Sequence, residues 1–464
     1  MSQTPSEGCS LWFEQALLPD GWARDVRITV ADGLISDLEI ETPRAPTDDA
    51  HGVALPGMPN VHSHAFQRAM AGLTEARGPA KSEGGGDAGD NFWTWRQLMY
   101  RFLDRGGPEE IEAITAFAFC DMLEGGFTRC AEFHYLHNDP TGGSYADPAE
   151  LTARIVAAAE TTGIALTLLP VFYAHSTFGG AESNHGQRRF ITDVDGFADL
   201  VTRGRSLTAR LPDAVVGVAP HSLRAVTPDE LAAMPGLAGD GPIHIHVAEQ
   251  TKEVDDCLAW SGSRPVEWLL ANAPVDERWC LIHSTHVTET ERRGVAKAGA
   301  VVGLCPLTEA NLGDGIFPAR DFVANGGRFG IGTDSNIQIG VADELRMLEY
   351  SQRLALRARG VMADAHRSTG RALFDRALSG GRQATGAEAS LKVGLPADII
   401  ELNTGGVGFA SRSGDAVLDS WIFGGARAIR SVWRRGKRVV ADGRHIARDA
   451  IEARYRKALS VVLG

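Results

Sequence analysis

Eight short runs rich in Val, Ile, Leu and Phe alternate with helical patterns through the middle of the 464-residue chain. Continuous apolar strands are typical of a parallel sheet that is covered on both faces. Eight strand–helix units predict an α/β fold, a (β/α)8 barrel with its active-site residues at the carboxyl ends of the strands. The competing fold, a doubly wound open sheet, lacks support because no Gly-rich dinucleotide motif is present. The runs lie near residues 54–62, 128–134, 164–172, 214–220, 242–248, 279–285, 300–306 and 329–334.

The segments between these runs carry the residues that begin and end helices. Residues 108–126 start with a proline followed by acids and finish in glycine, as helices commonly do. Residues 147–163 have the same form, and Asp147 is the expected N-cap of that helix. Residues 263–273 and 288–300 follow the same pattern, so helices are predicted in all four segments.

The two ends of the chain carry shorter, strand-like segments. VRITVADGLISDLEI and SVWRRGKRVVADGRH each contain an Asp-Gly pair, which signals a turn between two strands. We therefore expect residues 1–54 and 390–464 to form a small β-sandwich domain beside a catalytic barrel domain of residues 55–389. The polar, Gly-rich stretch 81–90 is interpreted as a solvated loop near the mouth of the active site.

Polar residues gather at the carboxyl ends of the expected strands. Eight of the 14 histidines lie there, which a random distribution would not produce, and carboxylates and an arginine accompany them. The residues are His62 and His64 after the first strand, Glu132, His134 and Tyr135 after the second, His221 and Arg224 after the fourth, His244, His246 and Glu249 at the fifth, His283 and His286 at the sixth, and Asp334 at the eighth.

His62 and His64 are separated by one residue, and side chains at positions i and i+2 of a strand point to the same side. Two imidazoles can therefore bind one cation, and zinc is the usual choice of a nitrogen-rich site. An exposed or otherwise hydrogen-bonded pair is the structural alternative. Partners elsewhere favour the metal: His246 can supply a third nitrogen, and Asp334 can complete the set unless it is a turn or N-cap residue.

Two residues beside this set suit proton transfer. Glu249 lies three residues after His246 and can shuttle protons next to a metal ion. His283, in LIHSTH, can act as a neighbouring base or electrostatic stabiliser, whereas His244 is interpreted as a packed residue and His286 as part of a loop. Because zinc lowers the pKa of a bound water to about 7, the combination predicts metal-assisted hydrolysis.

An HxH pair, a later His followed three residues on by Glu, a further His and then Asp together resemble the amidohydrolase superfamily. The resemblance covers almost the entire chain, since the split terminal segments and GLPADIIELN also fit it. Binuclear members usually carry a bridging carbamylated Lys at the fourth strand, where this chain reads VVGVAPHSLRAV, so the chain resembles the mononuclear deaminase-type branch. This implies one zinc ion per subunit. The implied ligands are His62, His64, His246 and Asp334, and the implied catalytic residues are Glu249, His283 and Asp334.

Within that superfamily the chain is similar to the formimidoylglutamate deiminase family. The matching stretches are LPGMPNVHSHAFQRAMAGLTE, FWTWRQLMYRF, AEFHYLH, APHSLRAV, HVAEQ and GTDSN, and the 81–90 insertion departs from the family pattern between two of them. The resemblance implies conversion of N-formimino-L-glutamate and water into N-formyl-L-glutamate and ammonia, a step of bacterial histidine degradation.

Such a substrate carries two carboxylates and a formimino group. Arg224 and Arg96 are the candidates for the carboxylates, because a guanidinium pairs with a carboxylate through two hydrogen bonds. Arg101 competes with Arg96, which could also be a surface charge on a helix. The remaining candidates for substrate contacts are Gln67, Tyr135, His221 and, more weakly, Ser335.

Two other functions stay open on the sequence alone. The first is deamination of a purine, pyrimidine or adenosine-type substrate by the same metal chemistry. Phe92, Trp93 and Trp95 could then stack on the ring, although FWTWRQLMYRF also fits the start of an amphipathic helix. The second is a catalytically inactive barrel that serves in binding or assembly, which the full set of metal and proton-transfer residues disfavours.

The composition limits the partners and the location. The formal net charge of −13 argues against an extended nucleic-acid surface, and no apolar run reaches the roughly 18–20 residues of a membrane span. The first residues do not resemble a signal peptide, and the six scattered cysteines form no CxxC pair, which is typical of reduced thiols. We expect a cytoplasmic enzyme with a small anionic substrate; a homodimer is what the family resemblance implies.

Overall fold

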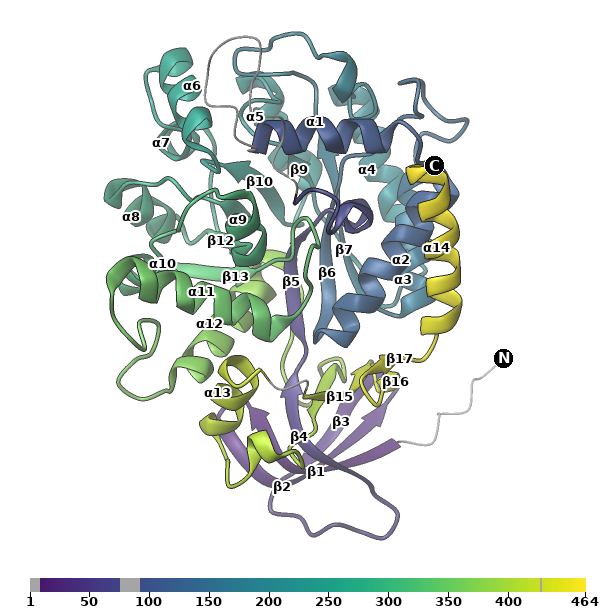
Figure 1. Cartoon of the computed structure of the whole chain (residues 1–464), viewed down its shortest axis with the longest axis vertical. Coiled ribbons are helices and arrows are strands. Elements are labelled where there is room, and N and C mark those ends of the chain that lie inside the picture. Colours follow the sequence, from purple (N-terminus) through teal and green to yellow (C-terminus); the bar gives the residue numbers. More distant parts are fainter. Residues whose placement is uncertain (1–8, 76–91, 426–427) are drawn as a thin grey trace.

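The computed structural model describes residues 9–75, 92–425 and 428–464 (Figure 1). A larger unit of parallel strands and surrounding helices adjoins a smaller unit of strands from both ends of the chain. The Gly-rich segment 81–90, predicted to be a loop, lies outside the described residues.

The strands of the larger unit confirm the eight apolar runs. Every side chain of the second and third of these strands is buried, because helices cover the sheets. The fourth run is split into two short strands. Gly217 between them lies so close to Pro242 that an added Cβ would be 2.2 Å from its carbonyl oxygen, so this position requires glycine. The strands are β5 (Met58–Ser63), β6 (Phe127–His134), β7 (Ala165–Phe172), β8 (Val215–Val216), β9 (Ala219–Pro220), β10 (Ile243–Val247), β11 (Trp279–His283), β12 (Val301–Leu304) and β13 (Arg328–Ile331).

These strands form two parallel sheets, β5-β6-β7-β8 with β9 beside β7, and β10-β11-β12-β13. Single bridges link the sheets, pairing Val218 with Ile243 and Ser63 with Asp334. At the second bridge the amide of Asp334 donates to the carbonyl of His62 at 3.0 Å. The carboxyl ends of β5 and β13, and the polar residues that follow them, therefore lie side by side.

Helices follow the strands, and their apolar faces share one core with the sheets. The predicted ends of α2 are confirmed, with Pro108 at its first position and Gly125 as its C-cap. The N-cap prediction at Asp147 is wrong: α3 begins at Glu150, and Asp147 instead accepts the amide of Ala149 at 2.9 Å in the preceding turn. The helices are η1 (Ala65–Met70), α1 (Phe92–Leu103), α2 (Pro108–Glu124), α3 (Glu150–Thr162), η2 (His185–Gln187), α4 (Val194–Thr208), α5 (Pro228–Ala238), α6 (Thr251–Ser261), α7 (Pro265–Asn272), α8 (Glu289–Ala298), α9 (Pro306–Leu312), α10 (Ala319–Ala324), α11 (Val341–Leu356), α12 (Thr369–Thr385), η3 (Val407–Phe409), α13 (Asp415–Phe423) and α14 (Arg448–Leu463).

Strands from the two ends of the chain form one mixed sheet in the order β17-β16-β15-β14-β4-β1-β2-β3. The predicted sandwich is thus a single hydrogen-bonded sheet, because β4 pairs in parallel with β1 and antiparallel with β14 and so joins the two ends. Both Asp-Gly pairs form turns as predicted, with positive φ at Asp32, Gly33, Asp442 and Gly443. The strands are β1 (Cys9–Leu18), β2 (Gly21–Ala31), β3 (Leu34–Glu39), β4 (Asp49–Pro56), β14 (Ile399–Leu402), β15 (Ile429–Arg434), β16 (Lys437–Ala441) and β17 (Arg444–His445).

The last helix, α14, packs on α2 of the larger unit. The rings of Phe117 and Tyr455 stack with their centroids 3.9 Å apart, and Arg448 forms ion pairs with Asp121 and Glu124. The C-terminal segment therefore contacts both units, and the proposed domain boundaries stay a prediction.

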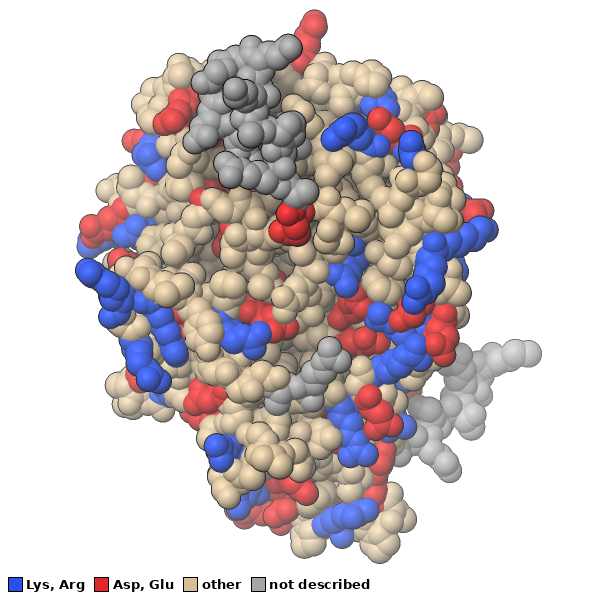
Figure 2. Space-filling model, viewed as in Figure 1, with Lys and Arg blue, Asp and Glu red and all other residues tan. Residues whose placement is uncertain are grey.

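Charges of both signs are interspersed on the face that Figure 2 shows, and the coloured residues form no broad basic area there. Among the helices within residues 9–75, 92–425 and 428–464, none combines the length and the apolar character that a bilayer crossing requires.

Candidate metal centre and active site

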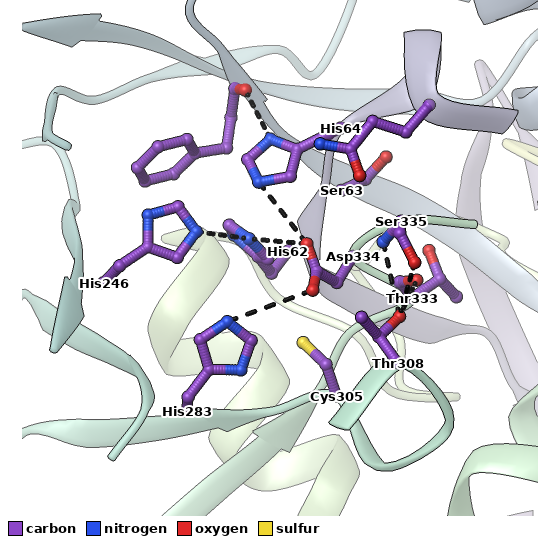
Figure 3. Close-up of polar contacts among 12 residues, drawn as sticks. His62, Ser63, His64, His246, His283, Cys305, Thr308, Thr333, Asp334 and Ser335 are labelled. Carbon is purple, nitrogen blue, oxygen red and sulfur yellow. Dashed lines mark hydrogen bonds and ion pairs between the residues drawn. The ribbon is translucent and has the colours of Figure 1, made fainter. Parts of the chain in front are cut away.

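Three histidines and one aspartate converge at the carboxyl ends of β5, β10 and β13 (Figure 3). Oδ1 of Asp334 lies 3.4 Å from Nε2 of both His62 and His64. Nε2 of His246 lies 3.0 Å from Nε2 of His62. One potential ligand atom of each residue lies within 4.8 Å of those of the other three. The structure therefore brings together the four residues that the sequence predicts as metal ligands.

Backbone carbonyls fix two of these imidazoles from behind. Nδ1 of His64 lies 3.1 Å from the carbonyl oxygen of Phe133, and Nδ1 of His246 lies 3.0 Å from that of His221. Because a carbonyl oxygen only accepts, each Nδ1 carries the proton and each Nε2 directs its lone pair to the centre. Burial lowers the pKa of His62 to about 3 and also lowers the pKa values of His64 and His246, so all three rings are neutral.

The chemistry of this donor set fits a zinc ion. Neutral imidazole nitrogens and a carboxylate oxygen are ordinary zinc ligands. Burial opposes ionisation of Asp334, but its contact with His62 and the surrounding imidazoles hold the pKa of Asp334 well below its ordinary value. Nδ1 of His62 has no hydrogen-bond partner among the described atoms, so its Nε2 is the nitrogen that engages the cluster.

Glu249 follows β10 at a tight turn. Ala248 has a φ of 53°, in the left-handed region, which redirects the chain after the strand. The fully buried Glu253 accepts the amides of Ala248 and Glu249 at 3.1 and 3.2 Å and holds this turn. Burial raises the pKa of Glu249 to about 7, against the lowering effect of His283 and Arg224. A carboxyl group with this pKa can take up and release a proton near neutral pH.

His283 lies at the end of β11 between carboxylates. Its Nε2 lies 3.9 Å from Oδ2 of Asp334 (Figure 3). The same nitrogen lies 3.7 Å from Oε1 of Glu249. Its Nδ1 lies 3.2 Å from Oε1 of Glu309. Burial alone would lower the pKa of His283, but the neighbouring carboxylates raise it to about 10. The ring is therefore held as a cation beside the metal-ligand cluster.

A pocket opens onto this cluster. It contains both predicted proton-transfer residues, three of the four predicted ligands, and all but one of the predicted substrate contacts, while His62 lies behind it. The lining residues are His64, Gln67, Trp95, Arg96, Met99, Tyr135, His221, Arg224, His246, Glu249, His283, Leu312 and Asp334.

Arg96 of α1 forms part of the pocket wall, and its Nη2 donates to the hydroxyl of Tyr173 at 2.8 Å. Arg101, the competing candidate, is exposed on the same helix. The structure therefore favours Arg96, together with Arg224, as the pair of cations that an anionic substrate would meet.

Three polar side chains complete the wall. Nε2 of Gln67 donates to the hydroxyl of Tyr135 at 3.0 Å. Burial, reinforced by Arg224 and Arg96, lowers the pKa of His221 well below its ordinary value. A neutral His221 and the two uncharged side chains can orient a substrate by hydrogen bonds without competing for its charges.

The structure does not bring Ser335 to the pocket. Its hydroxyl lies 3.0 Å from that of Thr308, and Asp334 just before it has a φ of 45° (Figure 3). The turn after β13 thus directs Asp334 to the cluster and Ser335 to α9, which corrects the expected substrate contact. His244 also lies away from the pocket, with Nε2 2.7 Å from the carbonyl oxygen of Ala384.

Sequence reasoning missed several neighbours of the site. Met99 and Leu312 line the pocket, while Glu253 and Glu309 contact the turn and the ring described above. A Glu four residues after Glu249 in a helix start is a weak signal for Glu253. The sequence gives no signal for Met99, Leu312 or Glu309, because their positions depend on how α1 and α9 pack.

Comparisons with known protein families agree with this architecture. The model of the amidohydrolase family matches residues 53–439, and that of the N-terminal domain of formimidoylglutamate deiminase HutF matches residues 11–52. A formimidoylglutamate deiminase of Pseudomonas aeruginosa is 50% identical over 98% of this chain and 99% of its own length. An 8-oxoguanine deaminase of the same species is 28% identical over 70% of this chain and 71% of its own.

Solved structures show the same fold. An amidohydrolase from Brucella melitensis superposes with a TM-score of 0.94 at 54% identity, over 98% of this chain and 100% of its own. An adenosine deaminase from Xanthomonas campestris, solved with bound zinc, superposes with a TM-score of 0.80 at 20% identity, over 98% of both chains. The match of one family model to most of the chain, and of full-length relatives at half identity, shows that the chain belongs to the amidohydrolase family.

Proposed function

We propose that this enzyme hydrolyses N-formimino-L-glutamate to N-formyl-L-glutamate and ammonia, as a step of histidine degradation. The observation that carries the proposal is the full-length, 50% identity to a formimidoylglutamate deiminase. The pocket supports it, because a His–Asp cluster, a carboxyl group of raised pKa and two arginines line the same small space.

The proposed metal ligands are Nε2 of His62, His64 and His246 together with the carboxylate of Asp334. We infer one zinc ion per subunit, in keeping with the neutral rings and the ionised carboxylate of the cluster. A zinc ion bound there would lower the pKa of a water molecule to about 7 and so supply the nucleophile.

Glu249 and His283 are the proposed catalytic side chains, together with Asp334. Glu249 takes a proton from the water that adds to the formimino carbon and delivers it to the terminal nitrogen. The same carboxylate then transfers the remaining hydroxyl proton of the adduct to that nitrogen, which leaves as ammonia while the carbonyl forms. His283, charged and 3.7 Å from Glu249, stabilises negative charge that develops on the attacking oxygen. Water adds and the C–N bond to the terminal nitrogen breaks, so the products are the formamide and ammonia.

Arg96 and Arg224 are the proposed partners of the two substrate carboxylates, and Gln67, Tyr135 and His221 of its remaining polar groups. Two guanidinium groups in one pocket match a dianion. The described residues thus favour an acidic amino-acid derivative over a neutral heterocycle.

The alternative is deamination of a purine, pyrimidine or adenosine-type ring. Trp95 and Tyr135 line the pocket and could stack on such a ring, and relatives at 28% identity include 8-oxoguanine deaminase. The test is ammonia release by the zinc-replete enzyme from formiminoglutamate and from a panel of purines and pyrimidines. Release only from formiminoglutamate supports the proposal, and release only from a heterocycle overturns it.

We further infer that the two parallel sheets form one closed (β/α)8 barrel, in keeping with the bridges at both junctions.

A cytoplasmic homodimer that binds a small anionic substrate, and neither nucleic acid nor membrane, completes the proposal. Light scattering at micromolar concentration should give twice the chain mass of 49.6 kDa; a monomer mass would contradict the dimer.

A further inference from the structure

The backbone that presents His283 is strained. His283 and Ser284 have φ values of 66° and 50°, which non-glycine residues rarely adopt in succession. The amide of Ser284 donates to the carbonyl of Val247 at 3.0 Å, so the strand end is tied to β10. These bonds fix the backbone at this point but leave the rotation of the imidazole to be set by its side-chain contacts.

Glu309 of α9 makes the contact on the far side of that ring. Its Oε1 lies 3.2 Å from Nδ1 of His283 and accepts the amide of Cys305 at 2.9 Å. The residue is only 6% exposed, so water does not compete strongly for this oxygen. The Cys305 amide orients the carboxylate, and the carboxylate in turn faces the ring.

We propose that Glu309 is a positioning residue for His283. Its carboxylate holds the proton on Nδ1 and sets the ring rotation that directs Nε2 to Glu249 and Asp334, at 3.7 and 3.9 Å. Outer partners of this kind commonly fix the orientation of a histidine at a metal site. The inference deepens the proposed function and rests on it, because it assumes that His283 acts on the reacting atoms.

The same region allows a different use. Atoms of His283, Cys305 and Glu309 lie close enough together to hold a metal ion. The positioning role is favoured because Oε1 of Glu309 already lies at hydrogen-bond distance from two N–H groups. A second metal ion per chain is therefore an outcome that the experiment must detect.

Glu344 offers a matched control for Glu309. It is buried in α11, and its Oε2 accepts the amide of Leu307 in α9, the helix that carries Glu309, at 3.0 Å. No described hydrogen bond or ion pair joins it to Glu249, His283 or the metal-ligand cluster. Replacing it removes a buried carboxyl group of α11 that contacts α9, without touching the ring of His283.

The experiment compares Glu309→Leu, Glu309→Gln and Glu344→Leu with the wild type, all loaded with zinc. In Glu309→Leu we expect kcat for formiminoglutamate to fall about 10–100-fold with KM changed less than about threefold. Glu309→Gln keeps an oxygen acceptor, so its kcat should be within about fivefold of that of the wild type. The kcat of Glu344→Leu should stay within about threefold of the wild-type value. A kcat of Glu309→Leu within twofold of wild type, or no rescue by Gln, would overturn the inference.

Two readouts do not depend on turnover. In the wild type, ¹⁵N NMR should show a protonated, hydrogen-bonded Nδ1 for His283, assigned by loss of the signal in His283→Asn. An unprotonated Nδ1 contradicts the inference even if Glu309→Leu fails to fold. Metal analysis should give one zinc per chain; a second equivalent that Glu309→Leu loses would instead support the second metal site. If the wild type shows the Nδ1 signal but does not turn over formiminoglutamate, the proposed function is wrong while the contact between Glu309 and His283 is upheld.

Discussion

Nε2 of His283 lies 3.7 Å from Oε1 of Glu249, so a histidine whose pKa is raised to about 10 faces a carboxyl group whose pKa is raised to about 7. Burial raises the pKa of Glu249, and the cation of His283 limits that rise. The pair can therefore hold a proton on the histidine while the carboxylate exchanges one near neutral pH.

Glu249→Gln should abolish measurable turnover while zinc stays bound. The substitution keeps the size of the side chain but removes the group that moves the proton, which typically contributes about 100- to 10,000-fold in rate. Metal analysis and steady-state ammonia release check both parts. Near-native activity in this variant would remove Glu249 from the proposed mechanism.

His62→Ala should lose zinc and activity together, because Nε2 of His62 contacts both His246 and Asp334. His244→Gln is the control: its ring is equally buried, but it lies near the amino end of β10 and contacts the carbonyl of Ala384. Zinc content after dialysis should fall only in His62→Ala. If His62→Ala retains one zinc per chain, His62 is not a metal ligand.

Arg96→Gln and Arg224→Gln should each lower kcat/KM for formiminoglutamate by about 10–100-fold, because a charge-assisted hydrogen bond is worth about 1.5–3 kcal/mol. The exposed Arg101→Gln should have little effect. Formiminoglycine lacks the side-chain carboxylate, so one of the two pocket variants should lose the preference for formiminoglutamate over formiminoglycine. Unchanged kinetics in both would exclude these arginines as carboxylate partners.

Acid should destabilise the protein through His137, which is buried with its Nε2 2.8 Å from the carbonyl oxygen of Val171. Burial lowers its pKa to about 4, below the unfolded value of about 6.5. Between these values the unfolded chain binds a proton that the folded chain does not, so the stability from this group is complete above about pH 6.5 and is lost as the pH falls.

His137→Gln should therefore reduce the acid sensitivity of the fold. Urea unfolding of the zinc-free protein at pH 6.5 and pH 5 should show a decrease in stability that is smaller in the variant by about 1.5 kcal/mol, since one proton per pH unit corresponds to about 1.4 kcal/mol and the unfolded histidine is half protonated at pH 6.5. An identical decrease in both proteins would show that His137 does not titrate differently on folding.

The sequence predicts the strands of the larger unit well, because buried parallel strands are continuous apolar runs whose ends are marked by polar residues. It also predicts the ligand set, since His62 and His64 share one side of a strand end and His246 and Asp334 end others. The HutF and amidohydrolase matches confirm the family resemblance that these motifs carry.

What the sequence does not predict depends on local turns and on contacts between distant segments. Ser335 is adjacent to Asp334, yet the turn after β13 directs it to Thr308. Glu309 looks like an ordinary helix residue until α9 packs it against His283, 26 positions earlier in the chain. The terminal segments form one sheet because β4 pairs with β1 along one edge and with β14 along the other, which strand patterns alone do not specify.

The most direct test of the account is product analysis by NMR of formiminoglutamate incubated with the zinc-replete enzyme. The account predicts one N-formyl-L-glutamate and one ammonia for each substrate consumed, since the proposed chemistry breaks the bond to the terminal nitrogen. Glutamate and formamide would mean that the other C–N bond breaks, and an unchanged substrate would mean that the pocket serves another molecule. Either result would contradict the proposed reaction.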